Sequence, residues 1–173
     1  MALALTTGEL SAKTNLGLGT GATNQPSANS QSLIANAQSP TSGTVDPVAS
    51  RYQLGEQLYL ENCSSCHFAI PPAVFPTETW RTLLQDQEHY GKQLPLIIGP
   101  SLLIMWDYLR TFSRPQAEKE PLPYRVSNSR NFKALHPKVK LSQPANIASC
   151  VTCHPGAAAY NFRRLASEWE NAP

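Results

Sequence analysis

Hydrophobic and polar positions divide the chain into two regions. Residues 6–50 are dominated by Ser, Thr, Gly, Asn, Gln and Ala, and Glu9, Lys13 and Asp46 are their only charges. Such a stretch cannot bury enough apolar surface to offset the entropy that it would lose on ordering. We therefore predict a flexible low-complexity leader over residues 1–50 and one ordered domain over residues 51–173.

The pattern in the ordered region predicts short helices. Ser50 is a candidate N-cap for a helix over residues 52–62, and Thr77 for a second helix that ends before Gly91. Pro100 suits the first turn of a third helix over residues 101–112. Shorter helical turns are expected in the sequences SRNFKAL, ANIASCVTC and YNFRRL. Only KVKL, residues 138–141, alternates as a strand does.

Proline-rich loops separate these helices. Residues 70–77 and 114–124 together carry six prolines, which fix φ and remove backbone donors. An irregular shell of this kind usually surrounds a bound group. The expected fold class is therefore mainly α: a small, loop-rich domain with short helices.

The cysteines occur in two copies of one motif. CSSCH spans residues 63–67 and CVTCH spans residues 150–154, and together they use all four cysteines and two of the four histidines. Cys-x-x-Cys-His is the attachment signature of c-type heme. Two thiols one helical turn apart add to the two heme vinyl groups, and the next residue places an imidazole under the iron. The pattern predicts two covalently attached heme c groups, wrapped by the short helices and bound by Cys63, Cys66, His67, Cys150, Cys153 and His154.

Two other uses of paired cysteines fit less well. The CxxC pairs of a zinc ribbon usually stand about 15–20 residues apart, whereas residues 67–149 separate these two pairs. A redox dithiol needs no histidine after the second cysteine, and the alternating strands and helices typical of that motif are missing. Heme attachment is the better interpretation.

The remaining histidines are candidates for the second axial position of each iron. They are His89, nearer in sequence to His67, and His136, nearer to His154. We predict two bis-histidine hemes with these local pairings, and crossed pairing stays open. Met105, in LLIMW, is another possible ligand, but its apolar neighbours favour core packing.

The sequence around the first motif resembles a known family. CSSCHFAIPPAVFPTETW, followed by HYG, is similar to the DHC family of diheme cytochromes c, and the isolated histidine before CVTCHPGAAAYNF extends the likeness. PTETWRTLLQD, YLRTFSRP and FKALHP resemble its cyanobacterial branch. The resemblance implies a small electron carrier with two six-coordinate hemes, with His89 and His136 as the distal ligands.

Six-coordinate iron has no vacant position for a substrate, so the expected function is outer-sphere electron transfer rather than enzyme catalysis. Two imidazoles favour low to intermediate reduction potentials. The main alternative is a peroxidase-like diheme enzyme with one open or switchable iron, which requires His89 or His136 to be away from the metal or to leave it on reduction. A third hypothesis is a subunit that docks within a larger redox complex and still conducts electrons.

Charge is unevenly distributed along the chain. Residues 51–120 hold six Lys or Arg against eight Asp or Glu, whereas residues 121–173 hold seven against two. The basic side chains either form a docking face for an acidic partner or neutralise heme propionates. The candidates are Arg125, Arg130, Lys133, Lys138 and Lys140. A net charge of +2 with 15% charged residues does not indicate a nucleic-acid binder.

Location and partners follow from the assembly of c-type heme, which is attached on the far side of an energy-transducing membrane. We expect the periplasm or the thylakoid lumen, with redox proteins as partners. The candidates are a membrane b-type cytochrome, by family resemblance, or a photosynthetic or respiratory component. The apolar start MALALTTG is either the remnant of an export signal or an unstructured terminus. A membrane anchor would require a longer precursor, since no stretch has the roughly 18 apolar residues of a spanning helix.

Overall fold

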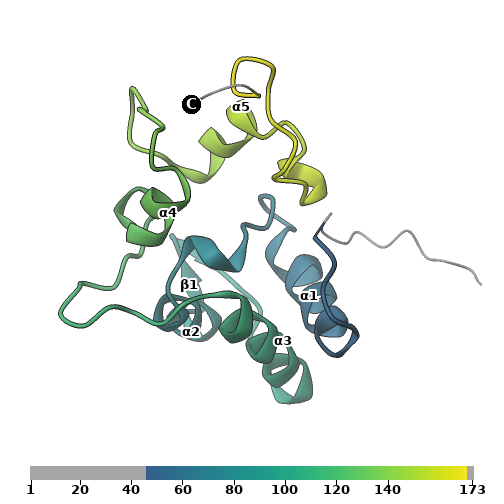
Figure 1. The fold of residues 1–173 in the computed structure, drawn as a ribbon. Helices are drawn as coiled ribbons and strands as arrows, with labels where there is room; N and C mark the ends of the chain where they lie inside the picture. The colour runs from purple at the N-terminus through teal and green to yellow at the C-terminus, as the bar shows by residue number, and fades with distance from the viewer. Residues whose placement is uncertain (1–45, 171–173) are drawn as a thin grey trace, which may run out of the picture. The chain divides into compact units, whose positions relative to one another are not determined.

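The computed structural model describes residues 46–170, and these are mostly helical with one two-stranded sheet (Figure 1). The predicted leader lies almost wholly outside the described residues. The mainly α, loop-rich fold class is confirmed. In chain order the elements are α1 (Ser50–Cys63), η1 (Pro72–Val74), α2 (Thr77–Gln85), β1 (Glu88–His89), β2 (Lys92–Gln93), α3 (Gly99–Phe112), η2 (Val126–Asn128), α4 (Arg130–Leu135), η3 (Ile147–Ser149), α5 (Cys150–Cys153) and η4 (Ala157–Ala159).

Helices α1 and α3 pack against each other and form the main part of the core. They lie close together at Gly55, where an added Cβ would be 2.7 Å from both the Ile104 carbonyl oxygen and the Tyr108 Cβ. Met105 is fully buried in α3, as its interpretation as a core residue predicts. Neither helix, nor any other among residues 46–170, meets the length and apolarity that crossing a membrane requires.

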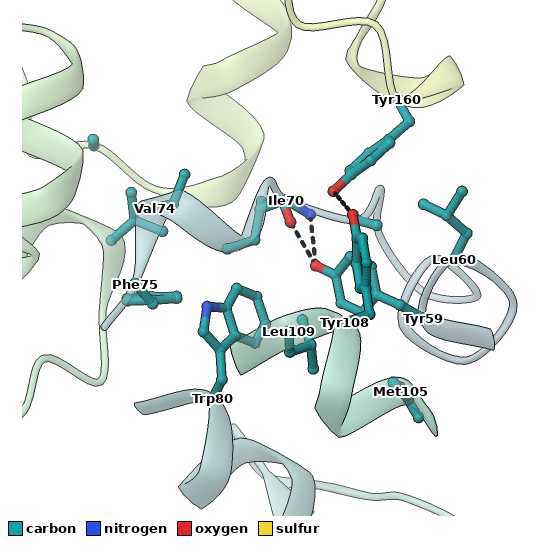
Figure 2. Close-up of a cluster of buried hydrophobic side chains, with 13 residues drawn as sticks. Tyr59, Leu60, Ile70, Val74, Phe75, Trp80, Met105, Tyr108, Leu109 and Tyr160 are labelled. Atoms are coloured by element: carbon teal, nitrogen blue, oxygen red, sulfur yellow. Dashed lines mark hydrogen bonds between the residues drawn. The ribbon is translucent and has the colours of Figure 1, made fainter. Parts of the chain in front are cut away.

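Buried aromatic side chains fasten the loop that follows the first motif. The Tyr59 hydroxyl donates to the Ile70 carbonyl oxygen at 2.6 Å and accepts from the Ile70 N–H at 3.1 Å (Figure 2). The Trp80 indole N–H donates to the Pro72 carbonyl oxygen at 2.8 Å. Since these donors and acceptors are removed from water, each pair holds the loop at a defined position on α1 and α2.

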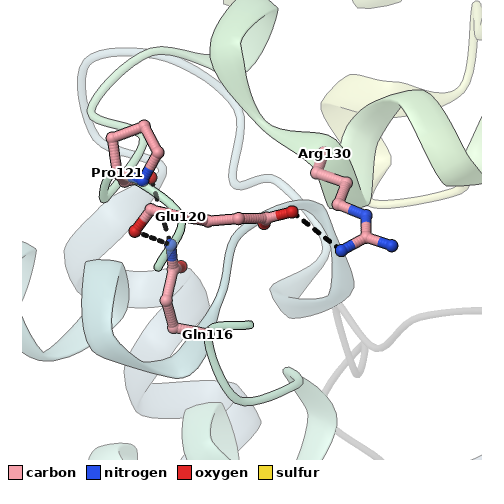
Figure 3. Close-up of polar contacts among 4 residues, drawn as sticks. All are labelled: Gln116, Glu120, Pro121 and Arg130. Carbon is pink, nitrogen blue, oxygen red and sulfur yellow. Dashed lines mark hydrogen bonds and ion pairs between the residues drawn. The ribbon is translucent and has the colours of Figure 1, made fainter. Parts of the chain in front are cut away.

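The long connection between α3 and η2, residues 113–125, contacts both α2 and α4. The Gln116 N–H donates to the Glu78 carboxylate of α2 at 2.7 Å, and its side-chain amide donates to the carbonyl oxygens of Glu120 and Pro121. Arg130, at the start of α4, forms an ion pair with Glu120 at 2.8 Å (Figure 3). The Arg130–Glu120 ion pair thus connects the start of α4 to this segment.

Several local predictions differ from the structure. Ser50 lies inside α1 rather than capping it, and Thr77 is the first residue of α2, where its hydroxyl contacts the Ser113 hydroxyl at 2.8 Å. Gly91 belongs to the turn between β1 and β2 instead of a helix end. The predicted strand at residues 138–141 and the predicted turn of helix at 160–165 are both irregular.

Candidate heme-binding sites

The first CxxCH motif opens into a largely apolar cavity of 280 Å³. Helix α1 ends at Cys63, and the chain then bends through Cys66 and His67 along the cavity wall. His89, carried by β1, also lines the cavity. The remaining walls include Tyr59, Ile70, Phe75, Trp80, Leu83, Leu84, Leu94, Leu96, Ile97 and Leu109.

The second motif lines a separate cavity of 630 Å³. Cys150 and Cys153 are the first and last residues of α5, so one helical turn separates them. A capping box between Asn146 and Ser149 starts the 3-10 turn that leads into this helix. His154 and His136 both line the cavity, together with Val74, Phe132, Leu135, Leu141, Phe162, Leu165 and Trp169. Because the two cysteine pairs face different cavities, they do not surround one zinc ion.

The four histidines lie in two pairs. The ring centres of His67 and His89 are 6.4 Å apart with an interplanar angle of 30°, and those of His136 and His154 are 6.1 Å apart with an angle of 73°. Metal–imidazole bonds are about 2.0 Å, so two imidazoles on opposite sides of one metal ion have ring centres about 6.2 Å apart. Both pairs have the spacing that an iron ion between them requires.

Backbone carbonyls orient one ring of each pair. The His67 Nδ1–H donates to the Phe68 carbonyl oxygen at 2.8 Å, and the His136 Nδ1–H donates to the Phe132 carbonyl oxygen at 2.8 Å. With Nδ1 engaged, Nε2 is the nitrogen left for a metal.

These cavities and histidine pairs agree with the comparisons to known proteins. A family model described as dihaem cytochrome c matches residues 59–162, more than half of the chain. The chain belongs to the dihaem cytochrome c family. As a member it contains two heme c groups, and it is a c-type cytochrome of the electron-carrier kind. The residues present suit these groups, because each cavity is lined by one cysteine pair and two histidines.

Two solved structures from Rhodobacter sphaeroides are similar to this cytochrome. One, of purified DHC, has 26% identity and a TM-score of 0.44 and covers 59% of this chain and 92% of its own. The other, a diheme cytochrome c, has 26% identity and a TM-score of 0.46, with coverage of 64% and 95%. Among curated proteins no match was found. The resemblance to a cyanobacterial branch stays a prediction.

Burial governs the protonation of the cytochrome's candidate ligands. Burial raises the pKa of the Cys63 thiol to about 12. Burial, and then the neighbouring His67, lower the pKa of His89. The pKa of His154 is also lowered, mainly by burial. Neutral imidazole is the form that binds a metal.

The cationic residues of the second half have different surroundings. Lys138 lines the second cavity, where its ammonium group can neutralise a propionate. Arg130 is paired with Glu120, and the guanidinium of Arg125 lies 5.3 Å from the centre of the Tyr90 ring. These three residues therefore do not behave as one uniform set of free surface charges.

Trp169 is a site residue that sequence reasoning did not assign. It lies near the end of the chain, well after the second motif, yet it lines the second cavity. A backbone hydrogen bond from the Ala166 N–H to the Cys153 carbonyl oxygen, at 2.9 Å, brings this tail back to α5. A large aromatic residue beyond a CxxCH motif was the available sequence signal.

Proposed function

We propose that this dihaem cytochrome c is an electron carrier in which each iron is coordinated by two histidines, so that neither iron has a free position. Cys63 and Cys66 hold one heme, and Cys150 and Cys153 hold the other. His67 pairs with His89, and His154 pairs with His136. The supporting observation is the ring spacing, 6.4 Å and 6.1 Å, in two cavities that each also contain one pair of cysteines.

Bound heme supplies an iron that changes by one electron between its ferric and ferrous states. The role of this chain is to hold that iron between two neutral imidazoles, to exclude water with apolar side chains and to leave no coordination position for a substrate. Two imidazole ligands favour low to intermediate reduction potentials. A peroxidase-like enzyme would instead need His89 or His136 to be away from its iron or to leave it on reduction.

The proposed location is the periplasm or the thylakoid lumen, where c-type heme is attached to exported chains. The proposed partners are redox proteins: a membrane b-type cytochrome, or a photosynthetic or respiratory carrier if the chain belongs to the cyanobacterial branch. Support for an acidic contact surface on the partner comes from the excess of Lys and Arg in residues 121–173.

Electron paramagnetic resonance and CO binding of the purified holoprotein test this proposal. Both hemes of the oxidised protein should be low-spin, and the reduced protein should bind CO only weakly, because CO must displace a histidine to reach either iron. The two low-spin signals should differ in shape, because one histidine pair is closer to parallel and the other closer to perpendicular. A high-spin heme that binds CO or peroxide would support the enzyme instead.

Single substitutions assign the ligands. His136→Ala and His89→Ala should each open one heme to CO while both hemes stay attached after acid-acetone extraction. Met105→Leu is the matched control, since Met105 is the other candidate ligand and is fully buried in the core. It should leave both hemes low-spin and closed. A closed, low-spin spectrum in His136→Ala would remove that residue from the proposed ligands.

A further inference from the structure

His89 is carried by a strained turn. The strand pair β1–β2 aligns His89 with Lys92, so Tyr90 and Gly91 form a two-residue hairpin turn. Both have positive φ, at 51° and 82°, as a type I′ turn requires. Glycine adopts such angles freely, whereas tyrosine does so rarely and at a cost in energy. Contacts of the Tyr90 side chain must therefore offset the energetic cost of its backbone conformation.

The Tyr90 ring supplies these contacts. It lies against the Tyr124 ring, with centres 4.5 Å apart, and its hydroxyl donates to the Tyr124 backbone carbonyl oxygen. The guanidinium of Arg125 lies over the same ring at 5.3 Å. The Tyr90 ring also meets His89 in an edge contact, with centres 4.7 Å apart and an interplanar angle of 75°.

Asp86 connects the other side of the turn to the same segment. One carboxylate oxygen accepts from the Glu88 N–H at 3.0 Å, just before His89, and the other accepts from the Tyr124 hydroxyl at 2.7 Å. The segment that bears Tyr124 is itself held in place, because the buried Thr79 hydroxyl donates to the Pro123 carbonyl oxygen at 3.0 Å. The turn is thus tied to a part of the fold that α2 fixes.

The two distal histidines differ in how they are oriented. The His136 Nδ1–H donates to the Phe132 carbonyl oxygen within its own helical segment. Among residues 46–170, the buried His89 Nδ1 has no hydrogen-bond partner. The direction of the His89 ring therefore depends on the residues that surround its turn.

We propose that Asp86, Tyr90 and Tyr124 form a clamp that positions His89 as the distal ligand of the first heme. This inference rests on the proposed function and adds positioning residues to it. The clamp keeps the iron closed by holding the short turn against the Tyr124 segment. Without it, His89 spends a larger fraction of time off the metal, and an external ligand competes more effectively.

The test is the affinity of the reduced holoprotein for CO in Tyr90→Phe and Tyr124→Phe, each of which removes one hydroxyl of the clamp. A net hydrogen bond shifts an equilibrium by a factor of roughly 2 to 10. Each variant should therefore raise CO affinity at one heme by up to about tenfold. Only one of the two low-spin resonance signals should change shape, and the other should stay as in the wild type.

Tyr52→Phe is the matched control. It also removes a phenol hydroxyl from a ring with an arginine over it, since Arg51 lies 4.5 Å from the Tyr52 ring centre, but Tyr52 lines neither cavity. Its CO affinity should equal that of the wild type. Tyr90→Asn separates the turn from the clamp, because asparagine tolerates positive φ but lacks the ring. It should open the heme at least as far as Tyr90→Phe does.

His89→Ala distinguishes the two levels of the proposal. If it opens one heme while Tyr90→Phe, Tyr124→Phe and Tyr90→Asn all bind CO as the wild type does, the clamp is overturned and the ligand assignment stands. If His89→Ala leaves both hemes closed, the assignment of His89 as a ligand fails and the clamp fails with it. Thermal melting of each variant verifies that the fold is intact.

Discussion

Ser129→Ala should destabilise the protein strongly for a change of one oxygen atom. The Ser129 side chain is completely buried, its hydroxyl donates to the Val74 carbonyl oxygen at 2.5 Å, and it accepts from the Phe132 N–H at 3.3 Å as the N-cap of α4. Loss of an N-cap costs about 0.5–2 kcal/mol. Leaving a buried carbonyl without its donor costs about 1–3 kcal/mol. We expect a total loss of about 2–4 kcal/mol in the free energy of unfolding.

Guanidinium unfolding of the holoprotein, followed by far-ultraviolet circular dichroism, measures this loss. Ser127→Ala is the matched control, because its hydroxyl has only a 3.4 Å contact with the Asn128 side chain, and it should change stability by no more than about 0.5 kcal/mol. Since α4 leads directly to His136, Ser129→Ala should also raise the affinity of the second heme for CO. A loss below about 1 kcal/mol would show that the cap and the buried hydrogen bond do not both contribute to stability as argued.

Two further substitutions test the core and the second cavity. Gly55→Ala should lower the free energy of unfolding by about 1–2 kcal/mol, because overpacking against the α3 backbone outweighs the gain of about 1 kcal/mol in helix propensity; a more stable variant in the same unfolding assay would contradict this. Trp169→Ala should lower the reduction potential of one heme, because water admitted to the second cavity favours the ferric state. A spectroelectrochemical titration in which neither potential moves would exclude this role.

Local sequence signals predicted part of the fold. Pro100 lies in the first turn of α3, and the helix expected over residues 52–62 falls within α1. The sequence predicts Thr77 as a cap because its hydroxyl could bond its own helix, but the hydroxyl instead contacts Ser113, the C-cap of α3. KVKL alternates without forming a strand, since Val139 and Leu141 line the second cavity. Tertiary packing decided these positions.

The candidate ligands were accessible to sequence reasoning because the chain has only four histidines and two of them follow CxxC pairs. The sequence did not reveal which neighbouring residues hold these histidines in position. The importance of Tyr90 depends on a turn with positive φ and on a contact with Tyr124, which lies more than thirty residues later. The sequence predicts a helix that ends before Gly91, because glycine is common both after helix ends and in tight turns.

The two sites are in contact through residues next to their proximal histidines, His67 and His154. Ile70 lines both cavities, and the Phe68 and Phe162 rings are 6.1 Å apart. The Phe68 carbonyl oxygen accepts a hydrogen bond from the His67 Nδ1–H. The ring centres of Phe162 and His154 are 5.6 Å apart. Phe68 and Phe162 thus connect one proximal histidine to the other. If each iron is bound by two histidines, as proposed, electrons must enter and leave through such groups, because neither metal then offers a position for an external ligand. We therefore expect electron transfer between the two hemes to pass through Phe68 and Phe162.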